Sequence, residues 1–267
     1  MNNRWGEPLR FNELLPTPGH GSAIPDSLSA ATGILSPAPA PVFVPQRKPA
    51  VRAAVKKVPG MTKDTMFVVR RGSTFHVISE DYSYKTEPYY TILQHEVDGK
   101  IVSPTSRQVL DAFVVPICLE RLKSAGIPVC EWGISQAYVP FPSILYGLNY
   151  FATSSDYFVV SNNEQAKETI KHITNKGKYP FCYQKLDEEA TIHTCTAIFG
   201  RTIKKCSAVS RYAGQIYDVF SIPLVSMVFV KTGKNFTLSS LAPMRYNHLT
   251  EPERELLSLY LANQEFL

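Results

Sequence analysis

The chain has 267 residues, which is enough for one large domain or two small ones, each with an ample core. Its hydrophobic fraction of 44% and charged fraction of 19% are ordinary for a globular protein and exclude a largely disordered or fibrous chain. The net charge of +5 is compatible with an anionic partner but does not require one. No apolar run reaches the ~20 residues of a membrane span. The N-terminus has no apolar signal core either, so we expect an intracellular protein, cytoplasmic or nuclear.

Residues 1–62 differ from the rest of the chain, because they contain half of its 20 prolines, separated largely by Ser, Ala and Gly. Such a segment buries too little apolar surface to offset the entropy of ordering it. From residue 47 onward it is also basic. We therefore predict a disordered, Pro-rich, basic arm over residues 1–62 and a single mixed α/β domain over residues 63–267. The prolines also make the arm a possible contact for a protein partner.

The first ordered elements are predicted from short apolar runs and turn residues. Residues 65–70 and 74–78 read as a hairpin around Gly72-Ser73, and residues 89–95 as a further strand. Asp98-Gly99 indicates a type I′ turn into residues 100–102. Ser103-Pro104 then favours a helix start, and Pro116 predicts either a kink or a second helix. A short buried strand follows over residues 127–130, and residues 133–155 read as loop and short helix.

The clearest signal lies between residues 156 and 185. Residues 157–160 form an apolar run that is typical of a buried strand, and Ser161 and Glu164 have the spacing of a capping box. Ala166, Ile170 and Ile173 give the following helix one apolar face. Residues 179–183 resume a strand pattern. This β-α-β unit predicts two parallel strands in one sheet.

The remainder of the chain reads as an antiparallel meander followed by a helix. The strand candidates are residues 190–199, 202–209, 215–222, 224–231 and 236–241, with Ala213-Gly214 as one of the turns. A capping box at Thr250 and Glu253 begins the last helix, and Leu257 and Leu261 lie on its apolar face. The predicted fold class is α+β (mixed α/β), in which one β-α-β unit is joined to an antiparallel β meander and preceded by the disordered arm.

Candidate catalytic and metal-binding residues give weak signals. The five cysteines show no C-x-x-C spacing and do not cluster with histidines, so we interpret them as buried free thiols and predict no metal or other cofactor. His76 and His193 both lie in predicted strands, but a two-histidine phosphoesterase requires H-x-[ST] twice. Ile78 and Cys195 occupy the third positions, so we expect strand histidines with satisfied hydrogen bonds. Cys195 as a nucleophile paired with a distant histidine stays open.

Residues 107–185 resemble the front part of ATP-grasp ligases of the ribosomal-protein-modifying kind. The resemblance rests on Ala125-Gly126-Ile127-Pro128-Val129, on Lys178-Tyr179-Pro180-Phe181, and on the helix start at residues 249–256. It implies a nucleotide-binding domain in which Lys185 matches the ATP-contacting lysine of that family. No glycine-rich loop of the kind that covers the phosphates in that family follows Lys185, and we find no later strand with the family's acidic and asparagine metal ligands. The resemblance therefore implies a degenerate domain.

Our first prediction is a non-enzymatic binding or assembly protein, such as a capsid- or nucleoprotein-associated one, that contacts nucleic acid or another anionic macromolecule. Its contacts would come from the basic arm and from a basic sheet face that also includes Lys231. The competing interpretation of this sheet face is an ordinary solvated surface. The first alternative is the degenerate nucleotide-binding domain with Lys185, and the second is a protein-docking module that uses the Pro-rich arm and the C-terminal helix. No catalytic residue is predicted, and the predicted nucleic-acid contacts are Arg47, Lys48, Arg52, Lys56, Lys57, Lys63, Arg70, Arg71, Arg201, Lys204 and Lys205.

Overall fold

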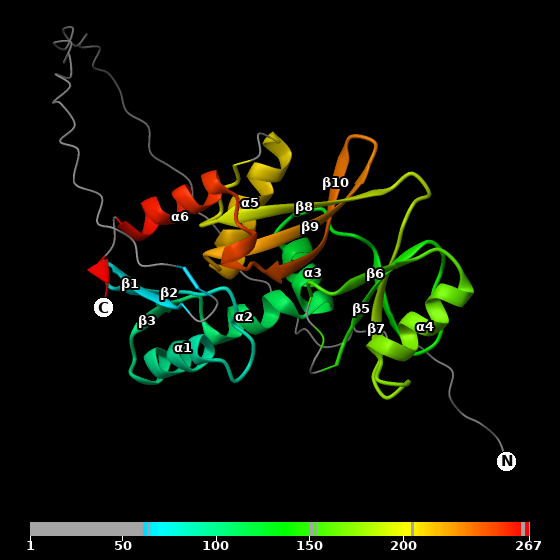
Figure 1. The fold of residues 1–267 in the computed structure, drawn as a ribbon, viewed down its shortest axis with the longest axis horizontal. Coiled ribbons are helices and arrows are strands. Elements are labelled where there is room, and N and C mark those ends of the chain that lie inside the picture. Colours follow the sequence, from blue (N-terminus) through cyan, green and yellow to red (C-terminus); the bar gives the residue numbers. More distant parts are fainter. Residues whose placement is uncertain are drawn as a thin grey trace, which may run out of the picture. The chain divides into compact units, whose positions relative to one another are not determined.

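The computed structural model describes residues 61–62, 65–149, 152, 154–203, 206–262 and 265–266. These residues form three β-sheets and six α-helices, which confirms the predicted α+β (mixed α/β) class (Figure 1). The predicted disorder of residues 1–60 falls outside the described residues. Among the helices that are described, none combines the length and the apolar character needed to cross a bilayer.

The first sheet, sheet A, has the strand order β11-β1-β2-β3. The predicted hairpin is confirmed as β1 (Phe67–Arg71) and β2 (Thr74–Ile78), while β3 (Ile101–Ser103) pairs with β2 in parallel and β11 (Glu265–Phe266) with β1. The strand predicted over residues 89–95 is wrong, because this segment lies in helix α1 (Glu87–Val97). The predicted hairpin at Asp98-Gly99 is wrong as well, since these residues end α1 and lead into a parallel strand.

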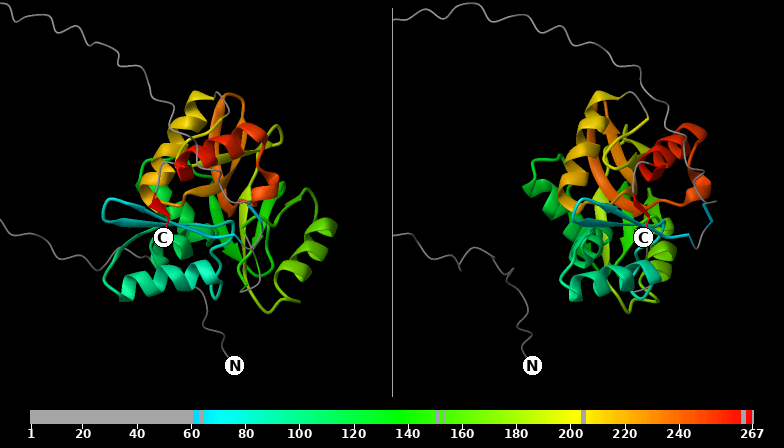
Figure 2. Two further views of the ribbon diagram at one scale, coloured as in Figure 1. Left: turned by 60° about the vertical axis from the view of Figure 1, so that its left-hand side comes forward. Right: turned by 90° about the vertical axis from the view of Figure 1, so that its left-hand side faces the viewer.

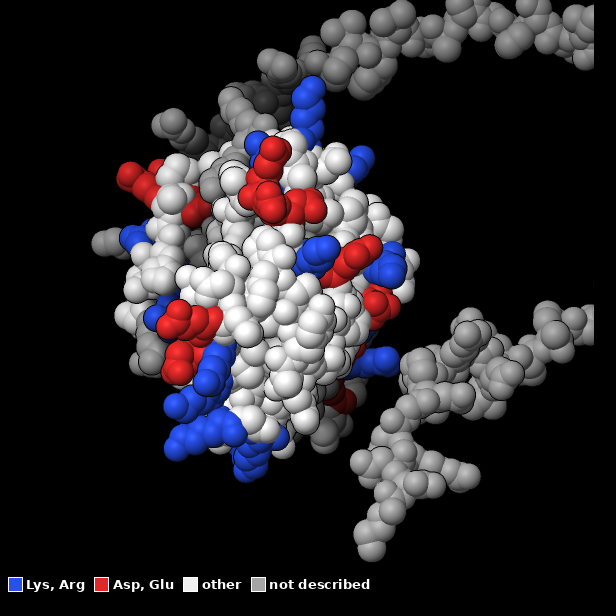
Figure 3. All heavy atoms as spheres, turned by 90° about the vertical axis from the view of Figure 1, so that its right-hand side faces the viewer, with Lys and Arg blue, Asp and Glu red and all other residues white. Residues whose placement is uncertain are grey.

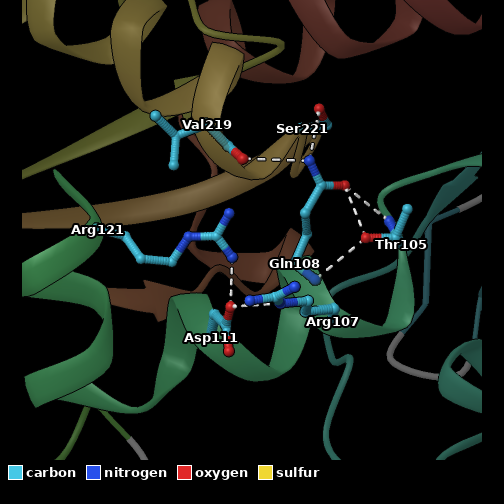
Figure 4. A network of polar contacts seen from close by, with 7 residues as sticks. All are labelled: Thr105, Arg107, Gln108, Asp111, Arg121, Val219 and Ser221. Carbon is cyan, nitrogen blue, oxygen red and sulfur yellow. Dashed lines mark hydrogen bonds and ion pairs between the residues drawn. The ribbon is translucent and has the colours of Figure 1, made fainter. Parts of the chain in front are cut away.

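Two short helices follow, α2 (Ser106–Phe113) and α3 (Val115–Ser124). Pro116 therefore lies in the first turn of a second helix, which was one of the two predicted outcomes. The first helix begins later than predicted, because Thr105 is its N-cap and Gln108 completes a capping box with it. The same glutamine donates to the backbone oxygen of Val219 at 3.1 Å (Figure 4). Asp111 pairs with Arg121, so polar contacts tie α2 to both α3 and α5 (Ser207–Phe220).

Sheet B is antiparallel and has the order β10-β9-β8, from β8 (Thr191–Ile198), β9 (Leu224–Thr232) and β10 (Asn235–Pro243). The two strands predicted over residues 202–209 and 215–222 are wrong, because α5 occupies the connection between β8 and β9. The predicted meander is thus interrupted by a helix. The buried residues of this helix follow helical and not strand spacing; they are Val209, Tyr212, Ala213, Ile216 and Phe220.

Sheet C has the order β4-β7-β5-β6, from β4 (Trp132–Ser135), β5 (Ser143–Gly147), β6 (Tyr157–Val160) and β7 (Phe181–Lys185). Both β6 and β7 run antiparallel to β5, which lies between them. They are therefore parallel to each other and joined by α4 (Asn163–Ile173), as the β-α-β unit predicted. The helix is capped by Asn162 and not by Ser161. The strands β4 and β5 occupy a stretch predicted as loop and short helix, so that prediction is wrong.

Helices cover both faces of sheet B (Figure 2). Met227 and Phe229 of β9 belong to the core that also contains the buried face of α5. On the opposite face, Leu224 packs with Leu257 and Leu261 of α6 (Glu251–Ala262). One half of the predicted capping box of α6 is present, since the Thr250 amide and hydroxyl both donate to Glu253 Oε2, at 2.8 and 2.9 Å. The short helix η1 (Tyr246–His248) connects β10 to α6.

Sheet C is likewise covered on both faces. Phe181 of β7 packs with Ala166 and Ile173 of α4 on one face. Cys182 and Ile144 on the other face share a core with residues of sheet B. The main core of the described residues thus draws on all three sheets, because Val77 of β2 and Val102 of β3 belong to it too.

Candidate functional site

Few of the predicted nucleic-acid contacts fall on described residues. Arg70 donates from Nε to the backbone oxygen of Gly72 at 3.0 Å, and its guanidinium lies 5.8 Å from the Phe75 ring centroid. Arg71 is the last residue of β1, and Arg201 lies 5.9 Å from the ring centroid of Tyr260. The remaining predicted contacts lie outside the described residues: Arg47, Lys48, Arg52, Lys56, Lys57, Lys63, Lys204 and Lys205.

The expected basic sheet face is not assembled by the described residues. Arg201 forms a β-bridge with Ile198 at one end of β8, whereas Lys231 pairs with Thr191 at the other end. Seven residues of extended strand separate these ends by roughly 23 Å. The face that carries α4 shows Asp and Glu among its Lys and Arg; one group of basic side chains lies at the lower left, and others are scattered at the right and the top (Figure 3).

The two strand histidines are held by different sheets. His193 Nε2 lies 3.1 Å from Thr191 Oγ1 on β8, and the His76 ring lies 6.4 Å from that of Phe199. His76 Nδ1 is buried and has no hydrogen-bond partner among the described residues, so the expectation of satisfied strand histidines fails there. Burial, with a smaller effect of the nearby Arg71, lowers the pKa of His76.

The prediction of buried thiols is confirmed for four of the five cysteines, while Cys206 is partly exposed. Cys195 lies in β8 with 7% of its surface exposed and belongs to the main core. Burial raises the pKa of the Cys130 thiol to about 11 and that of the Cys182 thiol to about 12. These two thiols are therefore protonated at neutral pH and poor nucleophiles.

Lys185 is the last residue of β7, and its side chain is exposed. Side chains alternate along a strand, so Lys185 starts from the same face as Phe181 and Tyr183. That face packs against α4. The neighbouring Gln184 points to the opposite face, toward sheet B.

Gln184 takes part in a polar network that joins sheet C to sheet B. Its Nε2 donates to the backbone oxygen of Ser239 at 2.8 Å, and Ser239 Oγ donates back to Gln184 Oε1 at 2.6 Å. The Tyr146 hydroxyl lies 2.7 Å from Ser239 Oγ and donates to Ser240 Oγ at 3.1 Å. All four residues are buried, and burial raises the pKa of Tyr146. The junction of sheets B and C is thus closed by neutral hydrogen-bonding groups, which form no sequence motif and were not predicted.

A cavity of about 490 Å³ lies where the three sheets meet. Its wall comes from the connection between β2 and α1, from the residues before β6, and from the residues at and after the end of β10. Glu80, 7% exposed, accepts a hydrogen bond at Oε2 from the Tyr246 amide at 2.9 Å. The charged residues of the wall are Glu80, Asp81, Glu87, Asp156 and Arg245. Sequence reasoning missed this cavity because connections between elements, far apart in the chain, supply its residues.

Comparison with known proteins relates this fold to one family. Residues 153–259 match the family model of the RimK-like ATP-grasp N-terminal domain, and this match covers fewer than half of the residues of the chain. A RimK-domain ATP-grasp protein from Sphaerobacter thermophilus has a similar fold, with a TM-score of 0.52 and 14% identity over 71% of this chain and 79% of that chain. A search of curated protein sequences found no match.

Two further solved structures align less well. D-alanine–D-alanine ligase from Helicobacter pylori aligns with a TM-score of 0.47 and 14% identity, over 63% of this chain and 65% of that chain. This chain thus spans less than two thirds of that ligase. The ATP-grasp ligase PsnB aligns with a TM-score of 0.46 and 12% identity, over 74% of this chain and 84% of that chain. At such identities the likeness is one of fold.

These findings overturn our first functional prediction. The matched family model is that of an ATP-grasp domain, and the Sphaerobacter protein with the similar fold is an ATP-grasp protein too, so the prediction of a non-enzymatic, structural nucleic-acid-binding protein is wrong. The charge excess that motivated it lies mostly in residues 47–63, outside the described residues. The alternative prediction, a domain resembling ATP-grasp ligases, agrees with the comparisons. The docking role of the Pro-rich arm also falls outside the described residues, and α6 buries Leu257 and Leu261 in the core of this chain.

Proposed function

We propose that this protein is a nucleotide-binding domain of the ATP-grasp kind. The observation that carries the proposal is the family match over residues 153–259. This range contains β6, α4 and β7 of sheet C together with the whole of sheet B. The similarity in fold to the Sphaerobacter RimK-domain protein supports it independently.

We place the nucleotide phosphates at the end of β7, with Lys185 as their cationic contact. Lys185 is exposed and takes part in none of the ion pairs found among the described residues, so its ammonium group is available to an anion. Its side chain starts on the α4 side of the sheet, and its flexible stem would have to bend around the strand end to reach the junction with sheet B.

The structure does not assign a magnesium site. The described residues contain no group of three or more His, Cys, Asp or Glu side chains arranged to hold a metal ion. The described residues therefore assemble no all-protein metal site, and we derive no ligase step. Nucleotide binding is the function proposed.

The test is thermal unfolding of the full chain with and without Mg-ATP. A ligand that binds only the folded state stabilises it by RT ln(1 + [L]/Kd), so we expect Mg-ATP to raise the Tm in a concentration-dependent way. Lys185→Ala should abolish the rise. Lys171→Ala removes an exposed lysine from α4 and serves as the matched control, which should keep it.

Each outcome separates two parts of the proposal. If Mg-ATP leaves the Tm of the unaltered chain unchanged, nucleotide binding is wrong. If the Tm rises equally in the unaltered chain and in Lys185→Ala, nucleotide binding stands and the role of Lys185 is wrong.

We also infer an intracellular location for this protein. All five cysteines are unpaired, which is typical of proteins from reducing compartments. Alkylation of the denatured, unreduced protein should label five thiols per chain, and a lower number would argue for a disulfide and against this location.

A further inference from the structure

The cavity at the junction of the three sheets continues into an apolar groove. A second cavity of about 320 Å³ shares Ser83 and Pro243 with it, and a third of about 320 Å³ shares Phe113 and Val114 with the second. Because each space shares wall residues with the next, we treat the three as one cleft and call it the junction cleft. It has an acidic end between α1 and β6 and an apolar end along α2 and α3.

The apolar end exposes several large side chains. Tyr84 is 51% exposed, Leu110 41% and Val114 40%, and all three line the second cavity. Ile117 and Ile134, also exposed, line the third. Exposed apolar side chains that gather in one concave surface are typical of a ligand-binding or partner-binding site.

Ser154 adds to this wall a hydroxyl whose hydrogen-bonding capacity is not satisfied by the described residues. The residue lines both apolar cavities and is 4% exposed, and its Oγ has no hydrogen-bond partner among the described residues. Its backbone oxygen is engaged, because it accepts from Ser240 Oγ at 3.4 Å. A buried hydroxyl without a partner costs about 1–3 kcal/mol, and a hydrogen-bonding group on a bound molecule would remove this cost.

The acidic end carries four carboxylates and one guanidinium. Glu87 and Asp156 are exposed, and neither takes part in an ion pair among the described residues. Arg245 is the single cation of the wall. A concave surface with this charge excess raises the local concentration of cations and disfavours anions.

We propose that the junction cleft binds a small amphipathic amine, with its apolar body against α2 and α3 and its ammonium group at the acidic end. A hydrogen-bonding group on the apolar body meets the Ser154 hydroxyl. The size of each apolar cavity suits a single aromatic ring. This proposal is independent of nucleotide binding, since it uses none of the residues at the end of β7.

Three probes that share a phenol ring and a two-carbon linker, and differ in their end group, test the charge preference by titration calorimetry on the full chain. Tyramine carries an ammonium group, tyrosol a neutral hydroxyl and 3-(4-hydroxyphenyl)propionate a carboxylate, all on the same phenol ring. We expect tyramine to bind roughly tenfold more tightly than tyrosol and the propionate to bind most weakly. Added salt should narrow the gap between tyramine and tyrosol, because it screens the exposed carboxylates.

Matched double variants locate the effect. Glu87→Gln with Asp156→Asn should reduce tyramine to the affinity of tyrosol and leave tyrosol unchanged. Glu164→Gln with Glu168→Gln removes the same charge from exposed positions of α4 and should preserve the preference. Ser154→Ala should weaken tyramine but not phenethylamine, which lacks the phenol hydroxyl.

Circular dichroism melts check that the variants are folded. We expect them to be, because the substituted carboxylates of both double variants are exposed. The proposal is overturned if none of the probes binds, if the three bind alike, or if the cleft variant keeps the preference for tyramine. A tyramine affinity that neither the cleft variant nor Ser154→Ala lowers would likewise overturn it.

Discussion

Individual polar residues in this protein differ sharply in how well the fold satisfies them. Gln184, Ser239 and Tyr146 are buried, and each has partners at hydrogen-bonding distance. His76 Nδ1 and Ser154 Oγ are buried without a partner among the described residues. Unsatisfied buried polar groups are uncommon, and each lowers the stability of the fold. At these two positions either the fold bears that cost or another molecule supplies the missing hydrogen bond. Ser154 lies in a cavity wall, and His76 does not line any of the cavities described above.

The burial of His76 predicts a pH dependence of stability. Because its pKa is lowered in the folded state, the unfolded state takes up the proton first as the pH falls below about 6.5. The stability that the neutral histidine permits is fully present above this pH and is lost as the pH falls toward the lowered pKa. His76→Leu should therefore lose less unfolding free energy between pH 7 and pH 5 than the unaltered chain does.

Urea unfolding at the two pH values measures this difference. His248→Gln replaces an exposed histidine after β10 and should behave like the unaltered chain. Equal losses in the unaltered chain and in His76→Leu would show that His76 titrates normally and contradict the effect of its burial.

Two helices with the same start signal show which elements could be predicted from the sequence. Thr250-Glu251-Pro252 begins α6 and Thr86-Glu87-Pro88 begins α1, with proline in the first turn of each. The signal was interpreted correctly for α6, where Leu256, Leu257 and Leu261 follow with helical spacing. In α1 it is followed by Tyr89-Tyr90-Thr91-Ile92, residues of high β-propensity, and this local preference favoured a strand. The burial of Tyr89 and Ile92 in the core outweighs this local β-propensity and stabilises the helix.

The helix α5 was missed for a related reason. Val209, Ile216 and Phe220 suit strands as readily as helices, and Gly214 was interpreted as a turn. The buried positions at 209, 212, 213, 216 and 220 nevertheless follow the helical period, so the signal was present in the spacing and not in the residue types.

Two glycines test whether α5 is a helix. Gly214 lies inside α5, and a Cβ added there would come no closer than 4.0 Å to any neighbouring atom. Gly214→Ala should therefore raise the free energy of unfolding by about 0.5–1 kcal/mol, because alanine costs less entropy in a helix. A turn at Ala213-Gly214 would instead make this variant neutral or destabilising.

Gly200→Ala should change the free energy of unfolding in the opposite direction to Gly214→Ala. Gly200 has a φ of +71°, and a Cβ there would lie 2.8 Å from Cβ of Tyr217. The substitution should lower the unfolding free energy by at least about 1 kcal/mol, through backbone strain and the clash with α5. Chemical denaturation of both variants measures the two signs. Equal signs would contradict this account of the β8–α5 connection.

At the scale of the whole molecule, the fold class can be predicted from the sequence and the site cannot. The β-α-β unit of sheet C and the hairpin of sheet A are local in the chain, so periodicity and turn residues reveal them. The junction cleft draws on residues within 79–88, 109–117, 147–149, 154–156 and 243–245, with Met66, Ile134 and Ala152, and the packing of three sheets brings them together. No spacing along the chain encodes that proximity. Lys185 shows the same limit, because the resemblance suggested its role and the structure alone shows which face of β7 it occupies.

The shared core predicts that sheets B and C unfold together. Tyr146 of β5 reaches Ser239 and Ser240 of β10, and both strands contribute to one hydrophobic core. Tyr146→Phe removes the hydroxyl and leaves buried serine oxygens short of a partner. It should lower the unfolding free energy by about 1–3 kcal/mol, whereas Tyr138→Phe, at a position 70% exposed, should have little effect.

Trp132 of β4 makes this prediction a test of cooperativity. The chain has two tryptophans, so Trp5→Phe leaves Trp132 in sheet C as the single tryptophan, which can be excited selectively over the tyrosines. In that background Tyr146→Phe should shift the fluorescence transition and the far-ultraviolet circular dichroism transition by the same amount, because breaking the junction destabilises one cooperative unit. A fluorescence transition that moves alone would mean that sheet C unfolds before sheet B. The hydrogen bonds at the junction would then stabilise the contact between two separately folding parts and not the fold as a whole.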